Sequence, residues 1–93
     1  MRVAYTSRFL RDYARLNAAL QRRTDKHFRL LLSNPRHPSL RIHKMAGYPS
    51  IYEARVTKGH RFTFQIANDT YTLRRVGTRT RISFNLTVLP DEA

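Results

Sequence analysis

The chain has 93 residues and carries 18 lysines and arginines against 6 aspartates and glutamates, which gives a net charge of +12. This length supports one small domain with a single core, so residues 1–93 are expected to form one unit. The lack of cysteine excludes disulfides and thiolate metal sites. No apolar run has the length of a membrane span, and the N-terminus lacks the apolar core of a signal peptide, so a cytoplasmic protein is expected.

The excess of positive charge points to an anionic partner. A field of this sign attracts polyanions whatever the fold. Nucleic acid is the first partner to consider, because lysines and arginines that meet phosphates release counterions. The alternatives are a basic domain that is merely soluble and one whose charge matches an acidic protein. We expect an acidic protein partner in addition to nucleic acid.

The N-terminal third predicts a strand and two helices. Residues 2–6 form the strand, Ser7 caps a helix over residues 7–16, and Asn17 caps a second over residues 18–33. Apolar residues recur at helical spacing in both segments: Phe9, Leu10, Tyr13 and Leu16 in the first, and Leu20, His27 or Phe28, Leu31 and Leu32 in the second. The pair Asn34-Pro35 ends the second helix. The helices are expected to form an antiparallel hairpin on the dry face of a sheet.

Residues 34–50 are rich in proline and predict a connection that contains a short strand at Leu40–Met45. Leu40 and Ile42 are expected to anchor this strand. The side chains of His43 and Lys44 are expected to point partly to solvent.

The stretch from residue 51 to residue 81 predicts three strands and two tight turns. Apolar and polar residues alternate through IYEARVT and RFTFQIA, the pattern of half-buried strands. Matching dry side to dry side pairs Val56 with Phe62, Ala54 with Phe64 and Tyr52 with Ile66. Lys58, Gly59 and His60 then form a three-residue loop, with positive φ at Gly59.

The next hairpin turns at Asn68-Asp69, which pairs Ile66 with Tyr71 and Phe64 with Leu73. On the opposite face, Arg55 is expected across from Thr63, and Thr63 across from Arg74. Arg55, Arg61 and Arg74 thus share a solvent-facing side of the sheet, and Gly77 brings Arg79 and Arg81 close to its edge.

Arginines grip phosphate oxygens bidentately and stabilise a charged phosphorane. They exchange protons poorly, because their pKa is too high. The sequence lacks phosphate-loop, nucleophile and metal-binding motifs, and no metal or cofactor is expected. His60, beside Arg61, is either a turn residue or a proton-transfer group. Glu53 is either a general base or the ion-pair partner of Arg55, Arg74 or a lysine.

The order of elements and the segments N-P-x-x-P-S-L, I-Y-E-A-R-V, G-H-R-F-T-F-Q-I and L-R-R-V-G-T-R resemble the RelE/ParE superfamily of bacterial toxins. The resemblance covers about Val3 to Arg81. It implies an α+β fold of order β-α-α-β-β-β, in which the N-terminal strand and helical hairpin pack on one face of a small, mainly antiparallel sheet. It also implies a cognate acidic antitoxin, with which the toxin forms a hetero-oligomer.

By this resemblance Arg61 contacts the scissile phosphate, Arg79 stabilises the transition state or helps the leaving group, and Arg55 replaces a strand lysine. Three departures stand out: Glu53 replaces a basic residue, Asn85 stands near the position of a tyrosine, and Arg79 with Thr80 replaces a His-Asp pair. The remaining RNA-binding candidates are Arg74, Arg81, Lys44, His43, Tyr48 and Phe84.

Two functions follow from the resemblance. The first is a metal-independent endoribonuclease that cuts mRNA in the ribosomal A site and inhibits translation. The second is a poison of DNA gyrase without nuclease activity, as in ParE-like members. A decayed toxin that only binds is a third alternative.

Overall fold

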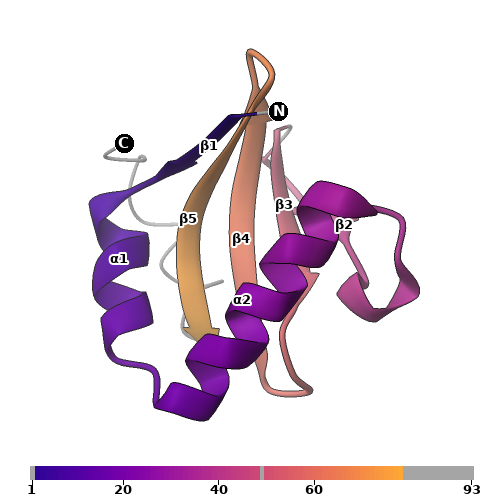
Figure 1. The fold of residues 1–93 in the computed structure, drawn as a ribbon. Helices are drawn as coiled ribbons and strands as arrows, with labels where there is room; N and C mark the ends of the chain where they lie inside the picture. Colours follow the sequence, from indigo (N-terminus) through magenta and orange to yellow (C-terminus); the bar gives the residue numbers. More distant parts are fainter. Residues whose placement is uncertain (1, 49, 79–93) are drawn as a thin grey trace.

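The computed structural model describes residues 2–48 and 50–78, and it has the α+β architecture that the sequence predicts (Figure 1). In chain order the elements are β1 (Arg2–Tyr5), α1 (Ser7–Ala14), α2 (Ala18–Ser33), the 3₁₀ helix η1 (Pro38–Leu40), β2 (His43–Lys44), β3 (Ile51–Arg55), β4 (His60–Ala67) and β5 (Thr70–Thr78). No helix among the described residues is long and apolar enough to cross a membrane.

The strands form one mixed sheet of order β1-β5-β4-β3-β2. β1 runs parallel to β5, and the other neighbours are antiparallel. Helix α2 crosses the sheet in front of its central strands, and α1 lies beside β5 (Figure 1). The predicted helical hairpin on one face of a mainly antiparallel sheet is therefore confirmed.

The core lies between the helices and the dry face of the sheet. It joins Phe9 of α1 and Leu31 of α2 to Leu40 and to the sheet residues Ala54, Val56, Phe62, Phe64, Tyr71, Leu73 and Val76. Phe62 and Phe64 are 0% and 1% exposed, so the alternation in β4 assigns the dry face correctly. Burial of side chains of this size contributes about 1.5–3 kcal/mol each.

Thr6, and not the predicted Ser7, caps α1. The backbone of Thr6 is extended, and its Oγ1 accepts a hydrogen bond from Phe9 N at 3.0 Å. The same hydroxyl donates to the carbonyl of Arg74 at 2.9 Å, so it also ties the helix start to β5. This second bond joins residues 68 positions apart in the chain, so local capping preferences alone could not identify Thr6 as the cap. Asn17 caps α2 as predicted, because its side chain accepts from Leu20 N.

The strand predicted over Leu40–Met45 is wrong in length. Leu40 ends the 3₁₀ helix and is fully buried, and Arg41 then adopts a left-handed conformation with φ 44° and ψ 49°. Only His43 and Lys44 pair with β3, opposite Glu53 and Tyr52. Strand β2 cannot begin before Arg41, because a residue in the left-handed region interrupts the extended backbone of a strand.

The predicted register between β3 and β4 is wrong by two residues. Ala54 pairs with Phe62 and Tyr52 with Phe64, so four residues, 56–59, separate the strands. A shift of two keeps every side chain on its predicted face, which is why the alternation could not distinguish the two registers. Gly59 does not have the predicted positive φ.

The second hairpin turns at Asn68-Asp69, as predicted. Both residues are left-handed, with φ of 51° and 57°, and the pairs Ile66–Tyr71 and Phe64–Leu73 are confirmed. Beyond them the register shifts between Phe64 and Thr63, so that Thr63 lies opposite Arg75. The predicted pairing of Thr63 with Arg74 is therefore wrong, because a bulge adds one residue to β5.

Candidate functional site

Arg61 lies near the start of β4, and its guanidinium folds back on the turn between β3 and β4. Its Nη1 donates to the carbonyls of Thr57 at 2.5 Å, Lys58 at 3.1 Å and His60 at 3.0 Å. The side chain is 14% exposed. The arginine thus fixes the turn and is itself held in one orientation.

Glu53 lies next to Arg61 on the adjacent strand. Its Oε1 is 3.8 Å from Nε of Arg61 and 3.5 Å from Nε2 of His43. The carboxylate is 4% exposed, so solvent screens these contacts little. An ion-pair role was one of the two predictions for Glu53. The partners differ from the predicted Arg55 and Arg74, because the true register moves Thr63 opposite Glu53.

Arg55 pairs directly with Arg61 across β3 and β4, instead of with the predicted Thr63. Like charges on directly opposite positions destabilise a sheet pair. Arg55 has no side-chain ion pair or hydrogen bond within residues 2–48 and 50–78. The structure therefore brings two of the predicted catalytic arginines together at this position.

Arg74 lies at the bulge, and its Nη1 donates to Oε1 of Gln65 at 3.4 Å. Arg74, Thr63 and Glu53 are 8%, 0% and 3% exposed. The sheet side that was predicted to face solvent is thus buried at its centre. Within residues 2–48 and 50–78, the predicted row of solvent-facing arginines is interrupted by buried Thr63 and Arg74.

His60 begins β4, and its Nδ1 lies 3.2 Å from Oγ1 of Thr57. It lines a cavity of about 300 Å³ together with Asp12, Arg15 and Gly77. Arg55 lines a different cavity. The contact with Thr57 supports the turn-residue prediction for His60, and no described contact joins its imidazole to Glu53.

His43 and Lys44 form the short strand β2 and are exposed, as predicted. Lys44 and Tyr48 line an open cavity of about 420 Å³ beyond the sheet edge. The remaining predicted site residues Arg79, Arg81 and Phe84 lie outside the described residues.

Sequence analysis missed a buried ion pair between α1 and β5. Asp12 accepts from Nε of Arg75 at 2.6 Å and from Nη2 at 3.2 Å, and it also accepts from the backbone N of Val76 at 3.2 Å. Asp12 and Arg75 are 7% and 6% exposed. The only signal available was one acidic residue in a basic helix, and nothing in the sequence connected it to a residue 63 positions later.

A basic cavity, also missed, lies where α2, η1 and the end of β3 meet. Its volume is about 600 Å³, and its charged lining residues are Arg23, Lys26, Arg41, Arg55 and Lys58. His27 lines it as well, and its Nδ1 donates to the carbonyl of Arg55 at 2.6 Å. Burial lowers the pKa of His27 below its usual 6.5, and Arg23 and Lys26 lower it further, against the effect of the hydrogen bond.

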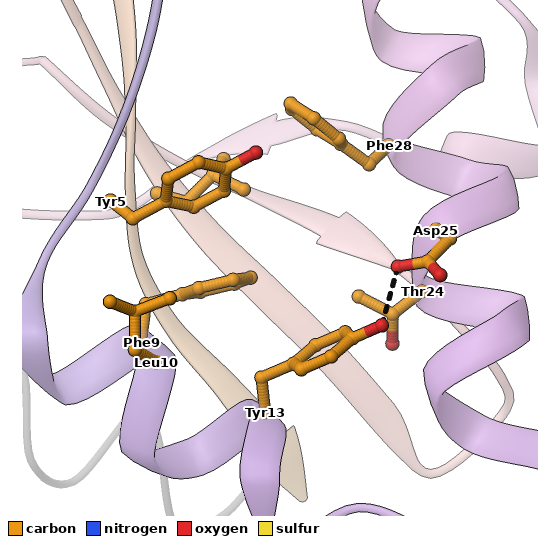
Figure 2. Close-up of a pocket in the computed structure, with 8 residues that line it drawn as sticks. Tyr5, Phe9, Leu10, Tyr13, Thr24, Asp25 and Phe28 are labelled. Atoms are coloured by element: carbon orange, nitrogen blue, oxygen red, sulfur yellow. Dashed lines mark hydrogen bonds between the residues drawn. The ribbon is translucent and has the colours of Figure 1, made fainter. Parts of the chain in front are cut away.

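An apolar groove of about 240 Å³ lies between α1 and α2. The rings of Tyr5, Phe9, Tyr13 and Phe28 surround it, and Tyr13 Oη donates to Oδ1 of Asp25 at 2.8 Å (Figure 2). Burial first, and then this hydrogen bond, raise the pKa of Tyr13 above its usual value. Tyr5 of β1 makes ring contacts with Phe9 of α1 and with Phe28 of α2, and the Tyr13–Asp25 hydrogen bond links the two helices directly.

Among the described residues, the arrangement around Arg61 can stabilise a phosphate, and its one carboxylate is already paired with the arginine. Arg61 and Arg55 supply positive charge, while Glu53 offsets part of it. Glu53 is the only carboxylate paired with Arg61 among the described residues, so it is the one candidate base at this position.

The sequence matches no protein-family model and no curated protein. Solved structures do match the fold. YafQ from E. coli strain BL21(DE3) is 16% identical, with a TM-score of 0.74 over 88% of this chain and 98% of that one. A YoeB/ParE toxin from Agrobacterium tumefaciens is 16% identical, with a TM-score of 0.74 over 85% and 99% of the two chains.

A third neighbour comes from the RelB-RelE antitoxin-toxin complex of Methanococcus jannaschii. It is 23% identical, with a TM-score of 0.72 over 88% of this chain and 96% of that chain. At these identities the likeness concerns the fold. This chain therefore shares its fold with these YafQ, YoeB/ParE and RelE structures.

Proposed function

We propose that this protein is the toxin of a type II toxin–antitoxin module and that it acts as a ribosome-dependent mRNA endoribonuclease. The 2′-hydroxyl of the RNA attacks the adjacent phosphorus and displaces the 5′-oxygen of the next nucleotide, without a metal. The products are a 2′,3′-cyclic phosphate and a 5′-hydroxyl. The 2′-hydroxyl loses its proton in this attack, and the departing 5′-oxygen takes up a proton, so the step balances without a cofactor.

One observation carries the proposal: Arg55 and Arg61 are direct cross-strand partners in a fold shared with RelE and YafQ. Two opposed cations cost stability, and an anion that meets both of them would offset more of this cost than Glu53 does alone. A guanidinium already fixed by three carbonyls needs little further ordering to bind a phosphate. In this account Arg61 contacts the scissile phosphate and Arg79 stabilises the charge of the transition state.

The cognate antitoxin is expected to be acidic and to form a hetero-oligomer with this chain in the cytoplasm. The net charge of +12 supports an acidic partner. The neighbour from Methanococcus jannaschii comes from a complex of a toxin with its antitoxin.

A second function, poisoning of DNA gyrase without RNA cleavage, is favoured by a different observation. Glu53 offsets part of the charge of Arg61, and His60 lines a cavity away from Arg55. The part of the site that the structure describes holds no separate acid and base, and this suits binding better than catalysis. A decayed toxin that only binds would share these features.

The test uses the purified protein in a reconstituted translation reaction. We expect full-length mRNA to be shortened only when ribosomes are present and translating. A parallel reaction with DNA gyrase and relaxed plasmid measures supercoiling. Intact mRNA together with blocked supercoiling would reject the nuclease and establish the gyrase poison, whereas intact mRNA and normal supercoiling would leave only the decayed toxin.

A further inference from the structure

The basic cavity between α2, η1 and the end of β3 adjoins the Arg61–Glu53 pair through Arg55, Thr57 and Lys58, but neither Arg61 nor Glu53 is among its lining residues. It has a volume of about 600 Å³, and Arg23, Lys26, Arg41, Arg55, Lys58 and His27 line it. None of the lining residues within 2–48 and 50–78 is acidic, so these cations repel one another without a counter-charge from that part of the chain. Such a site gains stability when an anion enters.

Three cations of this cavity also lack a polar partner outside it, among the residues that the structure describes. Within residues 2–48 and 50–78, the side chains of Arg23, Lys26 and Lys58 make no hydrogen bond or ion pair. In contrast, the buried guanidinium of Arg75 forms two hydrogen bonds with the carboxylate of Asp12. A cluster of unpaired positive charges in a concave site is more typical of a binding site for an anionic ligand than of an ordinary solvated surface.

Arg41 supplies an independent observation. It adopts φ 44° and ψ 49°, a left-handed conformation that is unfavourable for a residue other than glycine. Glycine would remove this cost, yet the position carries an arginine that lines the cavity. Backbone strain at a charged residue that lines a cavity is an accepted pointer to function.

We infer that this cavity binds a second backbone phosphodiester of the RNA, next to the one proposed to meet Arg61, with Arg55 positioned between the two. Arginine supplies the planar fork that grips phosphate oxygens in pairs, and Ser39 and Thr57 line the same cavity with hydroxyl groups. The cavity is large enough for a phosphate with an attached nucleoside. The choice of RNA over DNA rests on the proposed function, in which the substrate is messenger RNA.

The two cavity ends come from different elements, α2 on one side and the β3–β4 turn on the other. An RNA strand bound in the cavity would be held at two positions, one in the cavity and one at Arg61. This second contact would set the register of the RNA relative to the scissile phosphate. Messenger RNA and ribosomal RNA share this chemistry, and the test below separates them.

The experiment measures binding of a fluorescent RNA of about ten nucleotides to the full chain, with every 2′-hydroxyl methylated so that it cannot be cleaved. Arg23→Ala is compared with Arg22→Ala, because the two residues are neighbours on α2 with equal charge and only Arg23 lines the cavity. We expect Arg23→Ala to weaken binding about tenfold and to reduce the salt slope by about one, and Arg22→Ala to change either much less.

Arg41→Gly separates binding from folding. It removes the charge and relieves the left-handed strain, so it should weaken RNA binding while thermal stability stays equal or rises. Single-stranded RNA bound more tightly than an A-form duplex assigns the site to messenger RNA, and the reverse order assigns it to ribosomal RNA.

Equal losses in Arg22→Ala and Arg23→Ala, or unchanged binding in Arg41→Gly, would overturn the inference. The inference would also be overturned if Arg23→Ala and Arg41→Gly weakened binding of a polyglutamate peptide but not of RNA. The cavity would then be a site for an acidic protein partner. Because the RNA cannot be cut, loss of nuclease activity and loss of cavity binding are seen separately.

Discussion

The Nε atom of Arg61 lies 3.8 Å from Oε1 of Glu53, and the carboxylate is 4% exposed. This pair links the middle of β3 to the start of β4, while the other end of the guanidinium holds the carbonyls of the turn. The arginine that is proposed to meet the scissile phosphate is therefore oriented by its own hairpin. The same carboxylate reduces the positive charge that the phosphate meets.

Replacing Glu53 with glutamine distinguishes its two possible roles. If the carboxylate is an ion-pair partner, Glu53→Gln should raise RNA affinity a few-fold, because a charge within about 4 Å of Arg61 contributes on the order of 1 kcal/mol or more near a surface. Cleavage should then persist. A loss of cleavage by about 10²–10⁴-fold with intact RNA binding would instead identify Glu53 as the general base. Anisotropy and cleavage rates are measured on the same preparation.

Asp12 is predicted to be essential for stability. Asp12→Asn leaves the buried guanidinium of Arg75 without its counter-charge, and breaking a buried pair of this kind costs about 3–5 kcal/mol. Urea denaturation measures the free energy of unfolding. Asp69→Asn, in the exposed turn between β4 and β5, is the matched control and should cost less than about 0.5 kcal/mol. Similar values for both variants would show that the pair contributes little.

His27 should make stability fall in mild acid. Burial lowers the pKa of His27 in the folded protein below the usual 6.5, so below about pH 6.5 the unfolded chain binds more protons than the native one. The free energy of unfolding should therefore decrease as the pH falls from about 7 towards 5. His27→Gln should flatten this dependence, as measured by denaturation at several pH values. The same slope in both proteins would refute the assignment to His27.

The turn at Asn68-Asp69 offers a stabilising substitution. Asp69 has φ 57°, so Asp69→Gly should raise the free energy of unfolding by about 0.5–1 kcal/mol. Asp69→Val should lower it by about 1–2 kcal/mol, because a β-branched residue resists the left-handed region. The exposed Asp69→Asn variant corrects for the lost charge. Equal stability of the glycine and valine variants would contradict the turn geometry.

The elements that the sequence predicted correctly are those specified by local signals. Asn17 and the pair Asn34-Pro35 mark the ends of α2, and Asn68-Asp69 marks a hairpin turn. The alternation in β4 assigns Phe62 and Phe64 to the dry face. Each of these signals acts over a few residues, so no tertiary information is needed to read it.

The errors concern relationships that alternation does not encode. A shift of two residues between β3 and β4 leaves each side chain on the same face of the sheet. The bulge at Arg74 adds one residue to β5, and the alternation of apolar and polar residues does not predict it. The link from Asp12 to Arg75 joins residues far apart in the chain. The basic cavity collects residues from α2, the 3₁₀ region and the turn, so its charges look like ordinary surface residues until the fold brings them together.

The central claim is that Arg61 binds the phosphate that is cut in ribosome-bound mRNA. The most direct measurement maps mRNA 5′ ends in translation reactions with purified ribosomes, for the wild type, Arg61→Ala, Arg79→Ala and the control Arg22→Ala, after thermal melting has confirmed that each variant is folded. We predict cuts in phase with codons that require ribosomes, persist in Arg22→Ala and vanish in the other two variants. Intact mRNA at wild-type protein levels that still arrest growth, or unchanged cuts in folded Arg61→Ala, would contradict the account.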